Sequence, residues 1–185
     1  QDEYMPMLED RICKLEELLL EINGYVKHSK SHSIIESFNL EELVNDVWSE
    51  LEFMEGAFQL KFINGIDGTL EFTSDREGWR AIMSNLLSNA IKYHDLRKQE
   101  PFIRVGALYH NGKIELDVED NGQGVPSELQ GRLFEMFYRA HEISTGSGLG
   151  LFLVKKMVNK LNGEIVIEST HGQGTKVRIT VPWSA

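Results

Sequence analysis

Two glycine-rich segments of the chain carry residue types that could hold a ligand with both an amino group and a phosphate. The first, DNGQG at 120–124, places the carboxylate of Asp120 at the end of an alternating apolar pattern, where it can accept a hydrogen bond. Gly122 and Gly124 allow backbone turns that a side chain would forbid. The second, GSGLGL at 146–151, leads into a helical apolar pattern. A glycine-rich loop at a helix start presents several backbone N–H groups to an anion.

A third pattern lies upstream in NLLSNAIKY, where Asn85 and Asn89 are four residues apart. This spacing puts both amides on one face of a helix. Each pattern has an ordinary structural explanation when it stands alone: a turn, a flexible loop, or two polar residues that face solvent. The three patterns occur in this chain together, however. A segment that we expect to act as a lid, residues 132–148, lies between the first glycine-rich segment and the helix that follows the second one. Together they favour a nucleotide pocket.

With these patterns in order, the chain resembles the ATP-binding catalytic domain of two-component sensor histidine kinases, in the wider gyrase and histidine kinase ATPase superfamily. The resemblance covers roughly residues 33 to 183, and the N-terminal helix resembles the dimerisation region of the family. The matching segments are the N box (Asn85 to Tyr93), the first glycine box (Asp120 to Gly124), the F box (Phe134 to Phe137), the second glycine box (Gly146 to Leu151) and a terminal glycine box (Gly172 to Thr175).

The resemblance implies ATP as the ligand, together with Mg²⁺, which prefers oxygen ligands. Asp120 would accept a hydrogen bond from the amino group of adenine. Asn89, with Asn85 one turn earlier, would bind the metal ion, and Lys92 and Arg139 would lie near the phosphates. The residues expected to bind the nucleotide are Asn85, Asn89, Lys92, Tyr93, Asp120, Gly122, Gly124, Val125, Phe137, Gly146, Ser147, Gly148, Leu149, Gly150 and Thr175.

Position 85 also bears on the reaction. In hydrolysing relatives such as gyrase, a glutamate at the matching position activates water as a general base, and Asn85 cannot take up that proton. The resemblance therefore implies transfer of the γ-phosphoryl group to a histidine, for relay to the receiver domain of a response regulator. Asn85, Lys92 and Arg139 are the expected catalytic residues, acting by positioning and charge neutralisation. Two alternatives stay open: an ATPase or protein serine kinase of the same superfamily, and a non-catalytic nucleotide-sensing dimerisation module.

Between Met5 and Lys30, apolar residues alternate in steps of four and three, which is typical of a coiled-coil or bundle helix. So short a helix is marginal alone in water, so we expect a homodimer through it. The seam residues are Leu8, Ile12, Leu15, Leu19, Ile22 and Val26. We expect residues 1–32 to be the last helix of a dimerisation domain with its linker, and residues 33–185 to be the catalytic domain.

The histidines His28 and His32 lie in the polar stretch that follows this helix. Histidines near a helix C-terminus usually interact with solvent and with the helix dipole. Neither is followed by the acidic residue, arginine and proline of the family's H box. We therefore expect the phosphoacceptor histidine on a helix before Met5, outside this chain, and we expect the chain alone to be inactive in autophosphorylation.

Composition excludes several other functions. The formal net charge is −10 and the isoelectric point is about 5.1, so no broad basic surface is available for a nucleic-acid backbone. The single cysteine, Cys13, cannot form an internal disulfide, which fits a reducing, cytoplasmic setting. No apolar run approaches the roughly 18 residues of a membrane helix, so we expect no membrane contact by these residues.

The remaining pattern predicts an α+β domain: a two-layer sandwich in which three helices cover one face of a mostly antiparallel sheet, the Bergerat-type ATP-binding fold of the superfamily. Trp79 is expected in the core, and Ser74 or Asp75 as the cap of its helix. Expected strands include Ser37 to Leu40, Phe58 to Ile63, Leu70 to Thr73, Phe102 to Leu108, Glu164 to Ser169 and Thr175 to Val181, with a hairpin turn at Asn111-Gly112 and a helix end at Asn162-Gly163.

Overall fold

The computed structural model describes residue 12, residues 34–139 and residues 147–183. The other residues of the heptad pattern, His28, His32 and Gly146 lie outside the described part of the chain. The expected boundary between residues 32 and 33 also lies outside it. The division into a dimerisation helix and a catalytic domain therefore stays a prediction.

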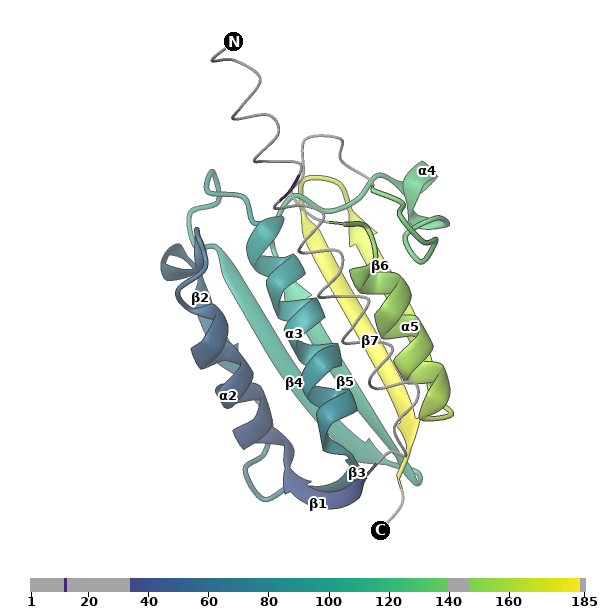
Figure 1. The fold of residues 1–185 in the computed structure, drawn as a ribbon. Helices are drawn as coiled ribbons and strands as arrows, with labels where there is room; N and C mark the ends of the chain where they lie inside the picture. Colours follow the sequence, from purple (N-terminus) through teal and green to yellow (C-terminus); the bar gives the residue numbers. More distant parts are fainter. Residues whose placement is uncertain (1–11, 13–33, 140–146, 184–185) are drawn as a thin grey trace.

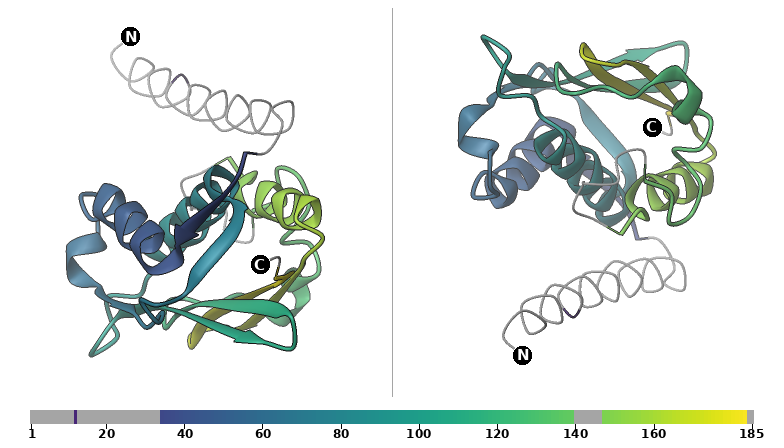
Figure 2. Two further views of the ribbon diagram at one scale, coloured as in Figure 1. Left: turned by 90° about the horizontal axis from the view of Figure 1, so that it is seen from below. Right: turned by 90° about the horizontal axis from the view of Figure 1, so that it is seen from above.

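The described chain forms two layers, a sheet with helices against one of its faces (Figures 1 and 2). The sheet has the order β2 (Lys61–Asn64), β4 (Phe102–His110), β5 (Lys113–Asp120), β7 (Gly174–Pro182) and β6 (Glu164–Thr170). Its one parallel pair is β2 with β4, and its other three pairs are antiparallel. Across the same face lie α2 (Leu40–Leu51), α3 (Arg76–Lys92) and α5 (Gly150–Lys160). No helix within the described residues is both long and apolar enough to cross a bilayer.

This architecture confirms the predicted fold class, with three differences in detail. First, β1 (Ile35–Asn39) and β3 (Glu71–Asp75) form a separate antiparallel pair and do not join the main sheet. Second, the strand expected at Phe58 to Ile63 is wrong in its first half, because η1 (Ala57–Gln59) is a 3₁₀ turn and β2 begins only at Lys61. Third, the short helix α4 (Ser127–Gln130) was not expected.

The hydrophobic core lies between the helices and the inner face of the sheet. Along β5, Ile114, Leu116 and Val118 are at most 3% exposed, while Glu115 and Asp117 alternate with them and face the other side. Burial of each such large apolar side chain stabilises the fold by about 1.5–3 kcal/mol. The matching face of α3 consists of Trp79, Ile82, Met83, Leu86, Leu87, Ala90 and Ile91.

The start of α3 is fixed by two side chains at the end of β3. The carboxylate of Asp75 accepts a hydrogen bond from Gly78 N at 3.0 Å, which satisfies one of the free N–H groups of the first turn. The indole Nε1 of the fully buried Trp79 donates to Ser74 Oγ at 3.1 Å. Both sequence predictions are confirmed here. Since these contacts set the rotation of the helix, they also decide which face carries Asn85 and Asn89.

Two turns complete the sheet at the end where these caps lie, since Trp183 contacts both Phe72 of β3 and Gly112. Asn111 and Gly112 have positive φ angles of 50° and 72°, as the tight hairpin between β4 and β5 requires. At the end of α5, Asn162 has a φ of 55°, and Gly163 N donates to Val158 O at 2.9 Å. This pattern ends the helix and returns the chain into β6.

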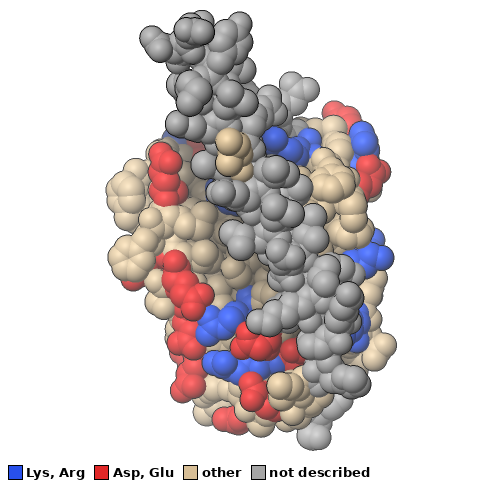
Figure 3. Space-filling view, viewed as in Figure 1, with Lys and Arg blue, Asp and Glu red and all other residues tan. Residues whose placement is uncertain are grey.

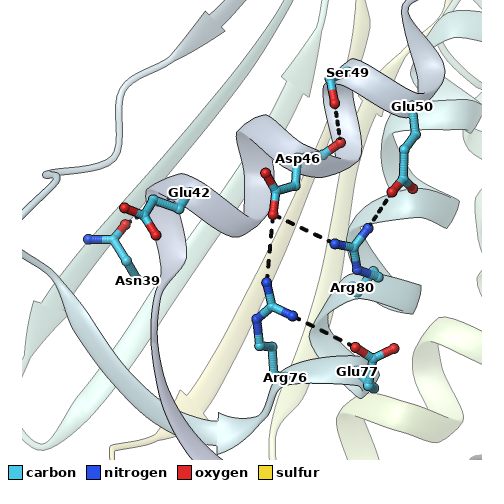
Figure 4. Close-up of polar contacts among 8 residues, drawn as sticks. All are labelled: Asn39, Glu42, Asp46, Ser49, Glu50, Arg76, Glu77 and Arg80. Atoms are coloured by element: carbon cyan, nitrogen blue, oxygen red, sulfur yellow. Dashed lines mark hydrogen bonds and ion pairs between the residues drawn. The ribbon is translucent and has the colours of Figure 1, made fainter.

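Ion pairs join α2 to α3 on the exposed side of the helical layer (Figure 4). Asp46 of α2 lies 3.6 Å from Arg76 and 3.7 Å from Arg80, and Glu50 lies 2.6 Å from Arg80. In the space-filling view, acidic groups border α2 and basic groups lie beside them (Figure 3). Exposed pairs of this kind contribute about 0–1 kcal/mol each, so they orient the helices more than they stabilise them.

Candidate functional site

A cavity of about 140 Å³ lies among α3, the start of α5 and the neighbouring ends of β5 and β7. A cavity of roughly 150 Å³ accepts a benzene ring, so this one suits a flat ring. Apolar side chains are typical of such ligand sites. Here they are Leu86, Ala90, Val118, Val125, Leu133, Leu151, Ile167 and Val177.

Asp120 places a carboxylate against this apolar lining, at the end of β5. Burial raises the pKa of Asp120 from its ordinary 3.8 to about 6, although hydrogen bonds from the backbone of Gly122 and Thr175 partly offset the rise. The bond from Gly122 N to Asp120 Oδ1 is 2.8 Å long. A carboxylate kept away from water is a strong acceptor for a donor that enters the cavity. It would select a ring that carries an amino group.

Asn85 and Asn89 line the cavity from α3, one turn apart. The amide nitrogen of Asn85 donates to Ala81 O at 2.8 Å, and its Oδ1 is directed to the start of α5. Gly150 permits this approach, because a Cβ there would stand only 2.9 Å from Asn85 Oδ1. The helical spacing recognised in the sequence therefore places two amide groups opposite the second glycine loop.

The N-terminus of α5 forms the opposite wall. Its capping residue, Leu149, makes no side-chain hydrogen bond to the first turn, and Gly150 and Leu151 line the cavity. Ser147 Oγ accepts a hydrogen bond from Leu149 N at 3.1 Å and so shapes the loop that enters the helix. A helix start with uncapped N–H groups has a partial positive charge and attracts anions such as phosphates.

Two cations also line the cavity, Lys92 at the end of α3 and Arg139 in the segment after α4. Within the described residues, no group of three or more histidine, cysteine, aspartate or glutamate side chains is placed to hold a metal ion. A metal ion at this site would therefore depend on amide oxygens and on its ligand's own phosphates. Mg²⁺ commonly binds in that way, with few protein ligands.

Comparison with known protein families agrees with this geometry. A family described as "Histidine kinase-, DNA gyrase B-, and HSP90-like ATPase" matches residues 74–185. The chain belongs to this family. Every residue that lines the cavity falls within the matched range. Residues 74–185 are thus an ATP-binding domain of the histidine kinase, gyrase and HSP90 type.

Two of the relatives with similar sequences are sensor kinases. The chain is 34% identical over 127 residues to the sensor protein kinase WalK of Staphylococcus haemolyticus, which is 65% of this chain and 21% of WalK. It is 31% identical over 193 residues to the histidine protein kinase DivJ of Caulobacter vibrioides, which is 95% of this chain and 32% of DivJ. The chain therefore spans about a fifth to a third of the length of these relatives.

A solved structure shows the same fold. The full-length ShkA structure, in complex with AMPPNP, matches with a TM-score of 0.78 and 20% sequence identity. The match covers all of this chain and 39% of ShkA. The shared fold includes the sheet and helices that surround the cavity.

Most of the residues that the sequence predicted for the ATP-binding site of this family lie together around the cavity. They are Asn85, Asn89, Lys92, Tyr93, Asp120, Gly124, Val125, Arg139, Ser147, Gly148, Gly150 and Thr175. Gly124 has a φ of 62°, and a Cβ there would overlap the carbonyl of Thr170, so only glycine fits. The individual roles assigned to these residues stay predictions.

Three predicted residues do not line the cavity, and Gly146 lies outside the described residues. Gly122 instead packs against the carbonyl of Tyr93 and donates its N–H to Asp120. Leu149 is 1% exposed and belongs to the core. Phe137 is 56% exposed, and its N–H donates to Gly148 O at 3.1 Å, which joins the F box to the second glycine box through the backbone.

The cavity also includes residues that were not predicted as part of the site. Ser88 lies between the two asparagines in sequence, and Tyr138 precedes Arg139. The others are the seven apolar residues of the lining besides Val125, which was predicted. In the sequence, alternating or helical spacing marked most of these positions as core, but only the three-dimensional fold shows which core residues face the cavity.

Proposed function

We propose that this chain binds ATP with Mg²⁺ as the catalytic domain of a protein-histidine kinase. In this proposal, the γ-phosphoryl group passes to a histidine outside the chain and is then relayed to an aspartate in the receiver domain of a response regulator. Membership of the ATPase family and the named sensor kinases among the relatives support the proposal. A homodimer through the N-terminal helix belongs to the same proposal.

The observation that best supports ATP as the ligand is the carboxylate of Asp120 within an apolar cavity of the size of a ring. Adenine is flat and presents an exocyclic amino donor, which matches a buried carboxylate acceptor. Guanine presents a carbonyl oxygen at the same ring position, and a carboxylate would repel it. Selectivity of this kind is large, because a wrong ring leaves the buried acceptor unpaired.

The residues around the other end of the cavity fit a triphosphate. The N–H groups at the start of α5, together with Lys92 and Arg139, would bind the phosphate oxygens. Asn89 and Asn85 would hold Mg²⁺ by their amide oxygens, and the bound ion would neutralise charge on the phosphates. Leu133 and Tyr138 line the cavity from the segment expected to act as a lid, where they would exclude water.

Asn85 favours transfer over hydrolysis. By the resemblance, it matches the position at which a glutamate activates water in hydrolysing relatives. Its amide nitrogen donates to Ala81 O. An amide has no basic atom that could accept the proton of water at neutral pH. Catalysis by this chain would then consist of positioning the nucleotide and neutralising its charge for an incoming imidazole.

Calorimetric titration tests the binding step. The wild-type chain should bind ATP more tightly with Mg²⁺ than with a chelator. Asp120→Ala should lose at least about tenfold in affinity, because a hydrogen bond to a charged group contributes roughly 1.5–3 kcal/mol. The matched control is Asp117→Ala, three residues earlier on the opposite face of β5, where the carboxylate pairs with Arg178 and does not line the cavity.

The control should bind ATP like the wild type. Equal losses in the two variants would show that the effect is not specific to the cavity. Undiminished ATP binding by Asp120→Ala, with the fold intact by circular dichroism, would remove Asp120 from the adenine role.

A further inference from the structure

Gln123, between the two glycines of the first glycine box, is hydrogen-bonded to the end of α3. Its backbone N–H donates to Tyr93 O at 2.9 Å, and its side-chain Nε2 donates to His94 O at 3.2 Å. Two successive carbonyl groups at the end of the N box are thus held by one residue. Since the side chain of Gln123 does not line the cavity, its contribution is to hold other residues.

The third contact of Gln123 reaches the turn between β6 and β7. Its carbonyl oxygen accepts a hydrogen bond from Gly172 N at 2.6 Å, and Gly172 O accepts one from Lys98 Nζ at 2.6 Å. Three segments far apart in sequence therefore meet at Gln123: the end of α3, the first glycine box and the terminal glycine turn. Each of these segments contains a residue that lines the cavity or is adjacent to such a residue in the sequence.

This junction sets the spacing of the part of the cavity that would hold the base. Tyr93 lines it from the end of α3, while Asp120 and Gly124 line it from the first glycine box. Gly122 lies directly against Tyr93 O, so the two segments are already at their closest approach. The hydrogen bonds of Gln123 keep them from moving apart. Glycines on both sides of Gln123 offer no side chain that could do the same.

We propose that Gln123 is a positioning residue that fixes Asp120 relative to Tyr93 and thereby sets the preference of the cavity for adenine over guanine nucleotides. This inference rests on the proposed function, because it concerns the same nucleotide site. When the two segments separate, the carboxylate of Asp120 becomes more accessible to water. Its hydrogen bond to the amino group of adenine then becomes weaker, and so does its repulsion of the carbonyl oxygen of guanine.

The test compares the binding of MgADP and MgGDP to the full chain by calorimetry. Gln123→Met has nearly the same length but no side-chain hydrogen bond. It should weaken MgADP binding by about fivefold, the effect of one lost neutral hydrogen bond, and should leave MgGDP binding within about twofold. The dissociation constant of MgGDP divided by that of MgADP should therefore decrease. A purely structural defect would lower the melting temperature and weaken both nucleotides equally.

Two further variants complete the design. The asparagine of Gln123→Asn is polar but one methylene too short to reach His94 O. This variant should therefore lower the same ratio of dissociation constants. It replaces the methionine variant if that variant does not fold. The matched control is Gln173→Met, in the exposed turn between β6 and β7, where only the backbone N–H makes a hydrogen bond with the described residues. It should keep the wild-type ratio.

An unchanged ratio in a folded Gln123→Met or Gln123→Asn chain would overturn this inference alone, provided that the wild type binds MgADP. A ratio that narrows equally in Gln173→Met would overturn it too. If the wild-type chain binds neither nucleotide, the proposed function fails and this inference fails with it.

Discussion

Replacing Asp120 by asparagine should stabilise the folded chain at neutral pH while it weakens ATP binding. Burial raises the pKa of Asp120 to about 6, compared with the ordinary 3.8. The folded state therefore binds this proton more tightly than the unfolded state does. The resulting contribution to stability is fully present below about pH 4 and is lost as the pH rises through 6. A site that keeps a charged carboxylate ready for a ligand is thus destabilising when no ligand is bound.

The size of the effect follows from the two pKa values. The difference between about 6 and 3.8, at 1.36 kcal/mol for each pKa unit, is about 3 kcal/mol. Asparagine does not titrate. The free energy of unfolding of Asp120→Asn minus that of the wild type should therefore increase by about 3 kcal/mol as the pH rises from 4 to 7.5. The stability of the variant is expected to be lower by a pH-independent amount of about 1 kcal/mol, because a single neutral amide oxygen replaces two carboxylate oxygens as the acceptor for the backbone N–H groups of Gly122 and Thr175.

Urea unfolding followed by tryptophan fluorescence at several pH values measures this difference, since Trp79 is fully buried in the core. Nucleotide affinity of the wild type should fall as the pH drops below about 6, because a protonated Asp120 is a weaker acceptor. Asp120→Asn should bind about 10- to 100-fold more weakly at pH 7.5. Parallel curves of unfolding free energy against pH for the two proteins between pH 4 and 7.5 would show that burial does not raise the pKa of Asp120.

Three other predictions concern the metal site, the helical layer and assembly. Asn89→Ala should bind ATP with nearly the same affinity with Mg²⁺ as with a chelator, and calorimetry that still shows a wild-type Mg²⁺ effect would count against Asn89 as a ligand. A double-mutant cycle of Asp46→Ala and Arg80→Ala should give a coupling free energy of unfolding below about 1 kcal/mol that shrinks in high salt, since Asp46 is 54% exposed; a larger, salt-independent value would contradict a surface pair. Sedimentation should show a dimer that Leu15→Glu or Leu19→Glu weakens, and a strict monomer at high micromolar concentration would mean that other residues supply the interface.

The sequence predicted the parts of the site that depend on local periodicity. The four-residue spacing of Asn85 and Asn89 determines a shared helix face in any α-helix, and the structure places both on the cavity. The turn glycine Gly124 could also be recognised, because positive φ angles favour glycine. Likewise, the apolar alternation of β5 located Asp120 at a strand end.

What could not be predicted depends on contacts between distant segments. Ile167 and Val177 look like any alternating strand residues, and only the pairing of β6 with β7 next to β5 brings them to the cavity. Leu149 was assigned to the phosphate loop, yet its side chain turns into the core. The separation of β1 and β3 from the main sheet likewise depends on long-range pairing.

Phosphotransfer to a separate acceptor helix is the direct test of whether this chain is the catalytic domain of a protein-histidine kinase. The chain is incubated with Mg²⁺ and γ-labelled ATP, with and without a dimerisation fragment that carries a histidine followed by an acidic residue. We expect acid-labile label on the fragment, none on the chain alone, and little release of inorganic phosphate. Label on the chain itself that His28→Ala or His32→Ala abolishes would contradict the placement of the acceptor. Rapid release of phosphate, or acid-stable label on the fragment, would contradict a histidine kinase and favour an ATPase or a serine kinase.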